Sequence, residues 1–282
     1  MTLNRIRRPI STLSLTRRSG LTLIELVVVI TILTAIGGLL VPVIGGMMSR
    51  THFAKCAVTI PDLTRQISRS FTGNLRYPNR WDSLISNVDG TSLYPNLPGG
   101  PSVSGELATL VLNVDQANGL NAIGMTQLVD LEPTVFAGGI AEDATWESAP
   151  LGQASVRQIA TGESVAVLNK LGPSAVSLNL KRHFGPDGVA GSADDDPFVE
   201  YMVFGVGSNC TAVGPSGLFV EAPTHFGGED VMNPIDVYQR YCVIFSTDAE
   251  GNILFETACS VHPEGFDGGE AHVRGFYQET RE

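Results

Sequence analysis

The sequence predicts an α+β protein in which a long N-terminal helix, with a transmembrane half and an amphipathic half, packs on a C-terminal antiparallel sheet head. Two patterns support this fold class. An almost uncharged apolar segment over residues 21–48 is followed, up to residue 72, by apolar residues at helical spacings of three and four, namely Phe53, Cys56, Ile60, Leu63, Ile67 and Phe71. The clearest strand patterns then lie near the C-terminus, in residues 198–258.

Charge is divided unevenly along the chain. Of its 282 residues, 43% are hydrophobic and 17% are charged, a balance typical of a globular protein. Residues 1–20 contain five arginines and no acidic residue, so 13 of the 18 Lys and Arg oppose all 29 Asp and Glu in the remainder, a formal charge of −16. A body this acidic repels phosphate groups, and we therefore do not expect nucleic acid as a partner.

The apolar segment is long enough to cross a membrane. Its only charged residue is Glu25. As a helix, residues 21–48 would rise about 42 Å, against a hydrocarbon core of about 30 Å. Arginines crowd its N-terminal side, whereas only Arg50 and Lys55 follow closely, so the N-terminus is expected in the cytoplasm and the head outside.

Two other kinds of apolar segment are alternatives to a processed membrane helix. An ordinary secretory signal cleaved near Ala35-Ile36-Gly37 would leave the rest of the apolar run and the early carboxylate of Glu25 unexplained. A plain uncleaved anchor is the better of these two alternatives.

A specific motif opens the segment. Arg17-Arg18-Ser19-Gly20 is followed by LTLIELVVVI over residues 21–30, and this junction resembles the class III signal of type IV prepilins and type II secretion pseudopilins. The resemblance covers only the N-terminal part of the chain. It implies that a prepilin peptidase cleaves after Gly20 and methylates the new amine on Leu21, where most members have Phe. It also implies a helix bend at Pro42.

The carboxylate of Glu25 needs a partner inside this apolar surrounding. A charged side chain at the centre of a bilayer costs about 2.5–3.5 kcal/mol on insertion scales. The family resemblance supplies the partner, the amine of Leu21 in the same subunit or in a neighbour of the filament, and gives Glu25 a role in assembly. A Glu that reaches up to the membrane interface is the alternative.

Three parts of the chain follow from these patterns. Residues 1–20 are expected to be a cleaved leader peptide, and residues 21–72 a spine helix that spans the membrane over residues 21–48. Residues 73–282 are expected to form a globular head. Within the head, residues 105–175 predict an insertion of short helices and loops, and residues 198–258 the C-terminal strands.

The last two strand patterns predict a hairpin and a disulfide. A two-residue turn at Glu250-Gly251 would place Cys242 directly opposite Cys259. Outside the cytoplasm such a pair favours a bridge, although a longer turn would shift the register and let Cys210 compete. Cys56 lies on the apolar stripe of the spine helix and is expected to be a buried free thiol.

A glycine-rich acidic stretch is a candidate calcium loop. Asp187, Asp194, Asp195 and Asp196 surround a flexible turn, and carboxylate oxygens are the ligands that calcium prefers. The stretch is similar to the loop by which major pseudopilins bind calcium, although about 85 residues follow it here. A solvated acidic turn without metal is the alternative.

No pattern of an enzyme is found. The sequence has no nucleophile elbow or HExxH motif, and its histidines are dispersed. The resemblance implies instead a structural subunit of a type IV pilus-like filament or a type II secretion pseudopilus in the inner membrane. Its implied partners are the prepilin peptidase, other subunits, the lipid bilayer and an assembly platform with its ATPase. A membrane-anchored binding or adhesion module is the second hypothesis.

Overall fold

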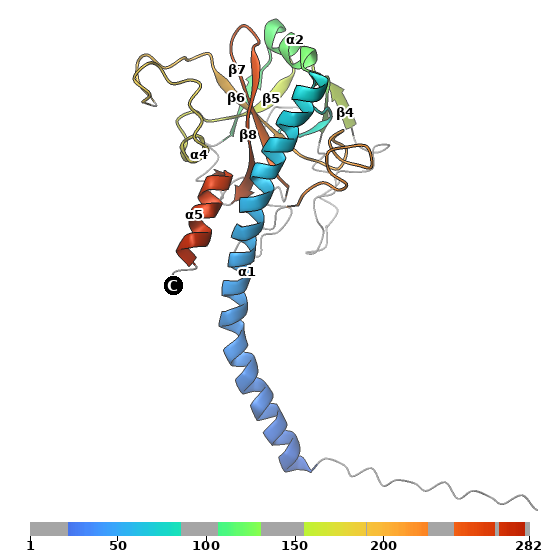
Figure 1. The fold of residues 1–282 in the computed structure, drawn as a ribbon, viewed down its shortest axis with the longest axis vertical. Helices are drawn as coiled ribbons and strands as arrows, with labels where there is room; N and C mark the ends of the chain where they lie inside the picture. The colour runs from blue at the N-terminus through green and yellow to red at the C-terminus, as the bar shows by residue number, and fades with distance from the viewer. Residues whose placement is uncertain are drawn as a thin grey trace, which may run out of the picture. The chain divides into compact units, whose positions relative to one another are not determined.

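The computed structural model describes residues 22–85, 107–130, 155–189, 191–224, 240–262 and 265–279 (Figure 1). Within these ranges the side chains of residues 39–50, 52, 262, 271, 272, 275, 276 and 279 are not described. The chain divides into two compact units, Met1–Gly46 and Met47–Glu282, and each is treated by itself.

Helix α1, Leu23–Asn74, contains 52 residues. It continues through Pro42 and Pro61 without a break, and the bend at Pro42 stays a prediction. The helix ends where Leu75 takes a left-handed φ of 55° and donates its N–H to the carbonyl of Phe71 at 2.7 Å. Among the described residues, no helix offers a stretch that is both long enough and apolar enough to cross a membrane.

The head contains a nine-stranded mixed sheet. Seven strands follow the order β4-β3-β1-β6-β7-β8-β9, β5 also pairs with β6, and β2 pairs with β5. Strands β1 and β3 are parallel, and the other pairs are antiparallel. The strands are β1 Trp81–Ser83, β2 Leu107–Val111, β3 Gln127–Asp130, β4 Ser155–Gln158, β5 Ser164–Leu168, β6 Glu200–Gly205, β7 Cys242–Thr247, β8 Ile253–His262 and β9 Gly265–Asp267. The shorter helices are α2 Val114–Ala122, α4 Pro173–Ser177 and α5 Gly269–Glu279.

The second half of α1 covers one face of the sheet. Cys56, Ile60, Leu63 and Ile67 recur at spacings of three and four residues and are at most 2% exposed, as the helical periodicity predicted. They pack with Val243 and Phe245 of β7 in one hydrophobic cluster. The opposite face carries a second cluster, in which Ile244 of β7 and Tyr201 of β6 meet residues of α4. The sheet is therefore buried on both sides.

Helix α1 and the residues after it also cover the edge of β8. Strand β9 pairs only with Ser260–His262, so the preceding part of β8 needs other partners. The N–H of Ala258 donates to Thr64 Oγ1 of α1 at 3.1 Å. Tyr77 hydrogen-bonds the backbone of Phe255 and stacks on Phe71, with ring centroids 4.3 Å apart. These contacts satisfy backbone groups that an open edge would offer to another strand.

The predicted fold class is wrong. The sheet is mixed rather than antiparallel, and it begins at Trp81 rather than near the C-terminus. No helix of the described part is apolar and long enough for the expected transmembrane half. Residues 107–168, expected as helices and loops, contribute four strands around α2, because pairing with buried neighbouring strands overrides a weak local pattern.

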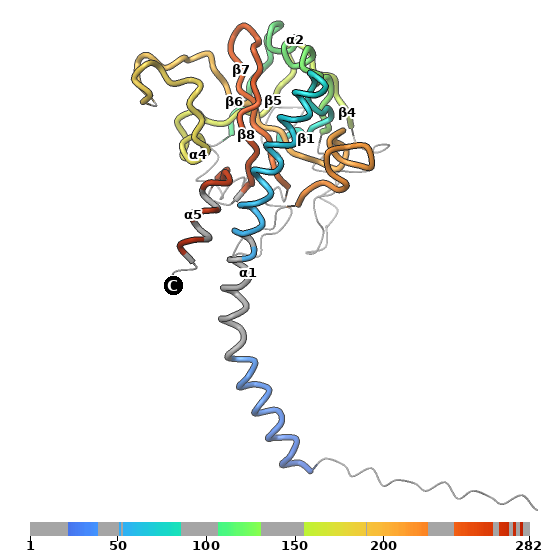
Figure 2. Tube along the Cα trace, in the orientation of Figure 1, coloured from blue at the N-terminus to red at the C-terminus, as the bar shows by residue number. Residues whose placement is uncertain are grey.

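The hairpin of β7 and β8 has a longer turn than predicted. Thr247 pairs with Ile253, so residues 248–252 form the turn that joins the two strands (Figure 2). A register shift lies between Ile244 and Phe245. The shift leaves Glu256 as one extra residue on β8, which is a β-bulge. Because the bulge compensates for the longer turn, Cys242 still lies directly opposite Cys259.

Candidate functional site

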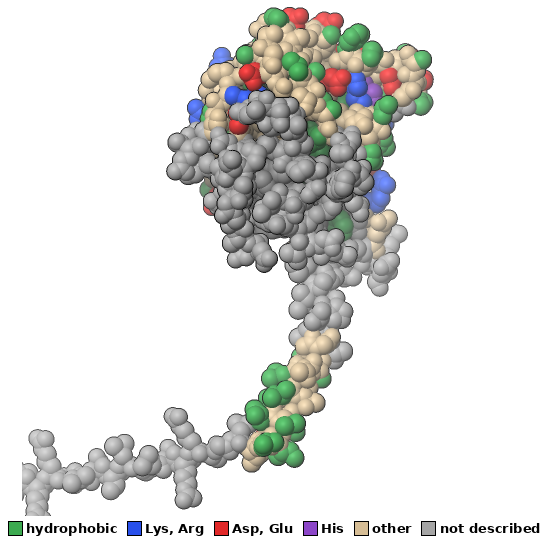
Figure 3. Space-filling view, turned by 180° about the vertical axis from the view of Figure 1, so that it is seen from behind, with side chains coloured by type: hydrophobic (Ala, Val, Ile, Leu, Met, Phe, Trp, Pro, Cys, Tyr) green, Lys and Arg blue, Asp and Glu red, His purple; other side chains and the backbone are tan. Residues whose placement is uncertain are grey.

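The first candidate site is the N-terminal end of α1. Side chains of residues 22–38 are all exposed, and apolar ones dominate the visible face of this segment (Figure 3). The exposed large apolar side chains are Leu23, Ile24, Leu26, Val27, Val28, Val29, Ile30, Ile32, Leu33 and Ile36. The predicted cleavage residues Gly20 and Leu21 lie outside the described residues. An exposed apolar surface of this kind needs lipid or protein to cover it.

Glu25 is held by Thr22 in a capping box at the start of α1. The backbone N–H and the hydroxyl of Thr22 donate to Glu25 Oε2 at 2.7 and 2.8 Å. In return, the N–H of Glu25 donates to Thr22 Oγ1 at 3.3 Å. The helix start thus fixes the carboxylate beside the backbone of residue 22, the second residue of the chain if cleavage follows Gly20.

The sequence reasoning singled out Glu25 but missed Thr22. The signal was present, because Thr22 and Glu25 stand in the Thr-x-x-Glu spacing of a capping box just before an apolar run. The assembly motif and the capping motif overlap in the same residues, and the family resemblance drew attention only to the first.

The acidic loop is the second candidate site. Ser192 Oγ donates to Asp194 Oδ1 at 2.6 Å and lies 3.3 Å from Oδ1 of both Asp187 and Asp195. Backbone N–H groups add to this network, and the one of Gly191 donates to Asp195 Oδ2 at 2.7 Å. The hydrogen bond from Ser192 is the main reason that the pKa of Asp194 lies below its usual value.

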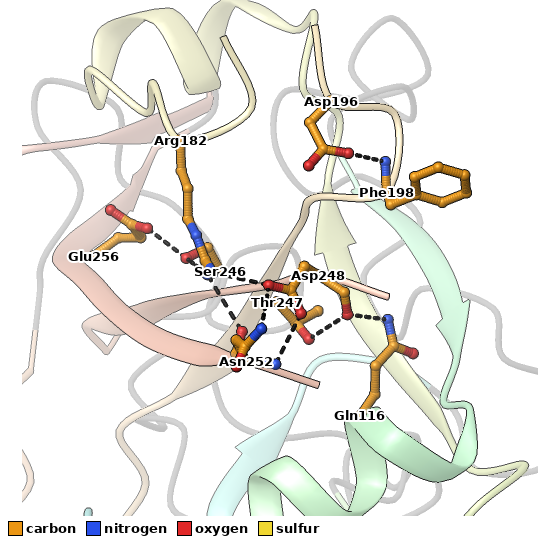
Figure 4. Close-up of polar contacts among 9 residues, drawn as sticks. All are labelled: Gln116, Arg182, Asp196, Phe198, Ser246, Thr247, Asp248, Asn252 and Glu256. Atoms are coloured by element: carbon orange, nitrogen blue, oxygen red, sulfur yellow. Dashed lines mark hydrogen bonds and ion pairs between the residues drawn. The ribbon is translucent and has the colours of Figure 1, made fainter. Parts of the chain in front are cut away.

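Acidic side chains of the loop also accept hydrogen bonds from its backbone. Asp196 Oδ1 accepts the N–H of Phe198 at 2.9 Å (Figure 4). Asp187 Oδ1 accepts the N–H of Val189 at 2.8 Å. In the part of the chain that the structure describes, no group of three His, Cys, Asp or Glu side chains could hold a metal ion. Calcium binding by Asp187, Asp194, Asp195 and Asp196 stays a prediction, and an acidic turn without metal stays its alternative.

The stem of the acidic loop is tied to the sheet by Arg182 (Figure 4). Its guanidinium donates to Ser246 Oγ at 2.7 Å and to Asp248 Oδ2 at 3.2 Å. The hydroxyl of Ser246 donates to Glu256, the bulged residue of β8. Burial opposes the ionised form of Asp248, but hydrogen bonds from Asn252 and the charge of Arg182 lower its pKa overall. The cluster joins the loop to the hairpin, and each of its polar groups is engaged.

His183 packs beneath the same loop. Its ring is 2% exposed, and Nδ1 lies 2.8 Å from the hydroxyl of Tyr201 on β6. Its carbonyl accepts the N–H of Asp196 at 2.7 Å. Burial lowers the pKa of His183, although the charge of Asp195 partly opposes that effect. His183 therefore joins the loop to β6 through its carbonyl and its Nδ1, while its buried Nε2 has no hydrogen-bond partner in the described part of the structure.

The cysteines divide between the two faces of the sheet. All four are buried free thiols in this structure. Cys242 and Cys259 face each other within the cluster opposite α1. Cys56 and Cys210 belong to the cluster beneath α1, which separates Cys210 from the pair. Burial raises the pKa of Cys56 to about 11, and its Sγ lies 3.5 Å from the hydroxyl of Tyr241.

Comparison of this chain with known protein families, with curated proteins and with solved structures finds no match.

Proposed function

We propose that this chain is a structural subunit of a type IV pilus-like filament or of a type II secretion pseudopilus. The observation that carries the proposal is the junction Arg17-Arg18-Ser19-Gly20 followed by residues 21–30, which resembles the prepilin signal. A prepilin peptidase then cleaves after Gly20 and methylates Leu21. The proposal is independent of any catalytic group in the head.

The exposed apolar start of α1 supports this role. Exposure of ten large apolar side chains to water is unfavourable for a soluble monomer. Contact with the same segment of neighbouring subunits would bury them and lower the free energy. The capping box also supports it, because it holds the Glu25 carboxylate at the helix start, near the amine that cleavage would create. Before assembly, the proposal places the chain at the inner membrane, with the head outside the cytoplasm.

Mass spectrometry of the mature N-terminus tests the proposal. We expect a chain that begins with N-methyl-Leu21 and that fractionates with filaments sheared from the cells. Gly20→Ala is expected to slow or stop cleavage, whereas Ser19→Ala, one residue away, leaves the glycine intact and serves as the matched control. An unprocessed Met1 terminus in cells that contain the peptidase would contradict the proposal.

A further inference from the structure

The two signs of charge are divided unequally along the sequence that follows residue 49. Residues 50–80 contain six Lys and Arg and one acidic residue, whereas residues 81–282 contain seven Lys and Arg and 27 acidic residues. Helix α1 is therefore a basic element on an acidic head. This separation gives one molecule two surfaces that attract each other.

The basic surface is a stripe along the solvent side of α1. Lys55, Val58, Asp62, Arg65 and Arg69 follow one another at spacings of three and four residues, so they share one face of the helix. Val58 is 71% exposed, and the side chain of Arg65 is 59% exposed. Arg65 reaches Asp62 only at 3.7 Å, and such exposed pairs contribute little, so the stripe keeps its positive character.

The acidic surface is the loop of residues 187–198. It carries the carboxylates of Asp187, Asp194 and Asp195 beside the exposed apolar side chains of Val189 and Phe198, which are 58% and 64% exposed. The ring of Phe198 points away from the polar cluster in Figure 4. The loop thus combines negative charge with exposed apolar side chains. The stripe is complementary to it, because there basic residues flank the exposed Val58.

The two surfaces belong to opposite sides of the sheet. Helix α1 packs on the cluster that contains Phe245, and the loop is anchored through His183 to Tyr201 in the other cluster. Within one copy they are separated by the sheet itself. Contact between them must join two copies, and because the patches differ, each copy can still offer its own loop to a third.

We propose that the acidic loop of one copy docks on the basic stripe of α1 in a neighbouring copy. The inference rests on the proposed filament and identifies a contact between heads within it. It assigns the attraction to Asp187, Asp194 and Asp195 on one side and to Lys55, Arg65 and Arg69 on the other. Such a heterologous contact repeats from subunit to subunit, and it weakens as salt screens the charges.

Cross-linking in sheared filaments tests the contact on the full chain. A carbodiimide joins carboxylates directly to amines, and Lys55 is the single lysine of the stripe. Filaments assembled from a mixture of ¹⁴N- and ¹⁵N-labelled subunits distinguish bonds between copies from bonds within one. We expect mixed-isotope peptides that join Lys55 to the acidic loop, and their loss in 0.5 M salt, since the Debye length falls to roughly 4–5 Å.

Variants provide the second arm of the test. Arg65→Glu with Arg69→Glu is expected to abolish the cross-link and most of the filament yield. Asp187→Asn, Asp194→Asn and Asp195→Asn together keep side chains of the same size and remove the charge, with the same expected loss. Lys181→Gln and Glu221→Gln change exposed charges elsewhere and are the matched controls.

The outcomes separate the two proposals. If wild-type protein is not processed or forms no filament, the proposed function fails. If processing and filaments are normal but the stripe and loop variants assemble as well as their controls, the docking contact is refuted while the filament stands. Lys55 cross-links confined to one copy, or to acidic residues outside the loop, would also refute it.

Discussion

At the residue scale, Glu25 combines two tasks that substitutions can separate. Its carboxylate caps α1 through Thr22, and the proposed filament also requires its negative charge. A glutamine at the same position preserves the capping box, because its side-chain oxygen accepts the same N–H group. The pair of variants Glu25→Gln and Glu25→Ala thus distinguishes the cap from the charge.

We expect Glu25→Gln and Glu25→Ala to be processed, yet both to enter filaments poorly, because both leave the Leu21 amine of the proposed contact without a counter-charge. The loss is expected to be somewhat larger for Glu25→Ala, which also removes the cap. Thr22→Val weakens the box but keeps the carboxylate, and its loss of assembly is expected to be smaller. The measurement is the fraction of each variant in sheared filaments. Normal assembly of Glu25→Gln together with failure of Glu25→Ala would assign the role to capping alone.

At the element scale, a single side chain joins α1 to the edge of β8. Thr64 Oγ1 accepts the N–H of Ala258, which lies on a part of β8 that β9 does not pair. Thr64→Val keeps the shape but leaves that donor unsatisfied, and we expect the free energy of unfolding to fall by about 1–3 kcal/mol. Thr64→Ser retains the hydroxyl and is the control. Equal stability of the two variants in urea unfolding would contradict this account.

The hairpin β7–β8 determines which cysteines can form a disulfide. Cys242 and Cys259 are directly opposed and separated from Cys210 by the sheet, so we expect one bridge between them in exported protein, with Cys56 and Cys210 as free thiols. On the chain-entropy model, closing the loop contributes about 3 kcal/mol. Peptide mapping without reduction measures the pairing. Recovery of Cys242 and Cys259 as free thiols would overturn the bridge.

At the scale of the whole molecule, the buried thiol of Cys56 and the buried hydroxyl of Tyr201 make the free energy of unfolding decrease at high pH. Burial raises the pKa of Cys56 from 9.0 to about 11 and that of Tyr201 from 10.0 to about 12. Both groups are neutral in the folded state at a pH where the unfolded chain would release the proton. Their contribution to stability is complete below pH 9 and is lost as the pH rises through these values.

We therefore expect the Tm of the purified, reduced chain to fall between pH 9 and 11. The fall is expected to be shallower in Cys56→Ser, because the hydroxyl does not ionise in this range. Cys56→Ser at pH 7 gives the baseline for its altered packing. Circular dichroism at a series of pH values measures the slopes, and identical slopes for the variant and the wild type would show that Cys56 does not contribute.

The sequence by itself determined the features that depend on neighbours along the chain. The spacing of Cys56, Ile60, Leu63 and Ile67 predicted the buried face of α1, because a helix brings residues three and four apart to one side. The opposition of Cys242 and Cys259 was also predicted correctly, but from a two-residue turn. In the structure the turn has five residues, which shifts the pairing of the two strands. The bulge at Glu256 shifts the pairing back, so that Cys242 still lies opposite Cys259.

Only the tertiary structure decided the features that depend on distant partners. Strands β2, β3, β4 and β5 lie where helices and loops were expected, and they form because β3 pairs with β1, β5 pairs with β6, and β4 and β2 extend the sheet from β3 and β5. The hydrogen bond from the N–H of Phe198 to Asp196 depends on backbone geometry that the count of acidic residues does not contain. The separation of the basic stripe from the acidic loop likewise follows from the sheet between them, since composition records charge but not the face on which it lies.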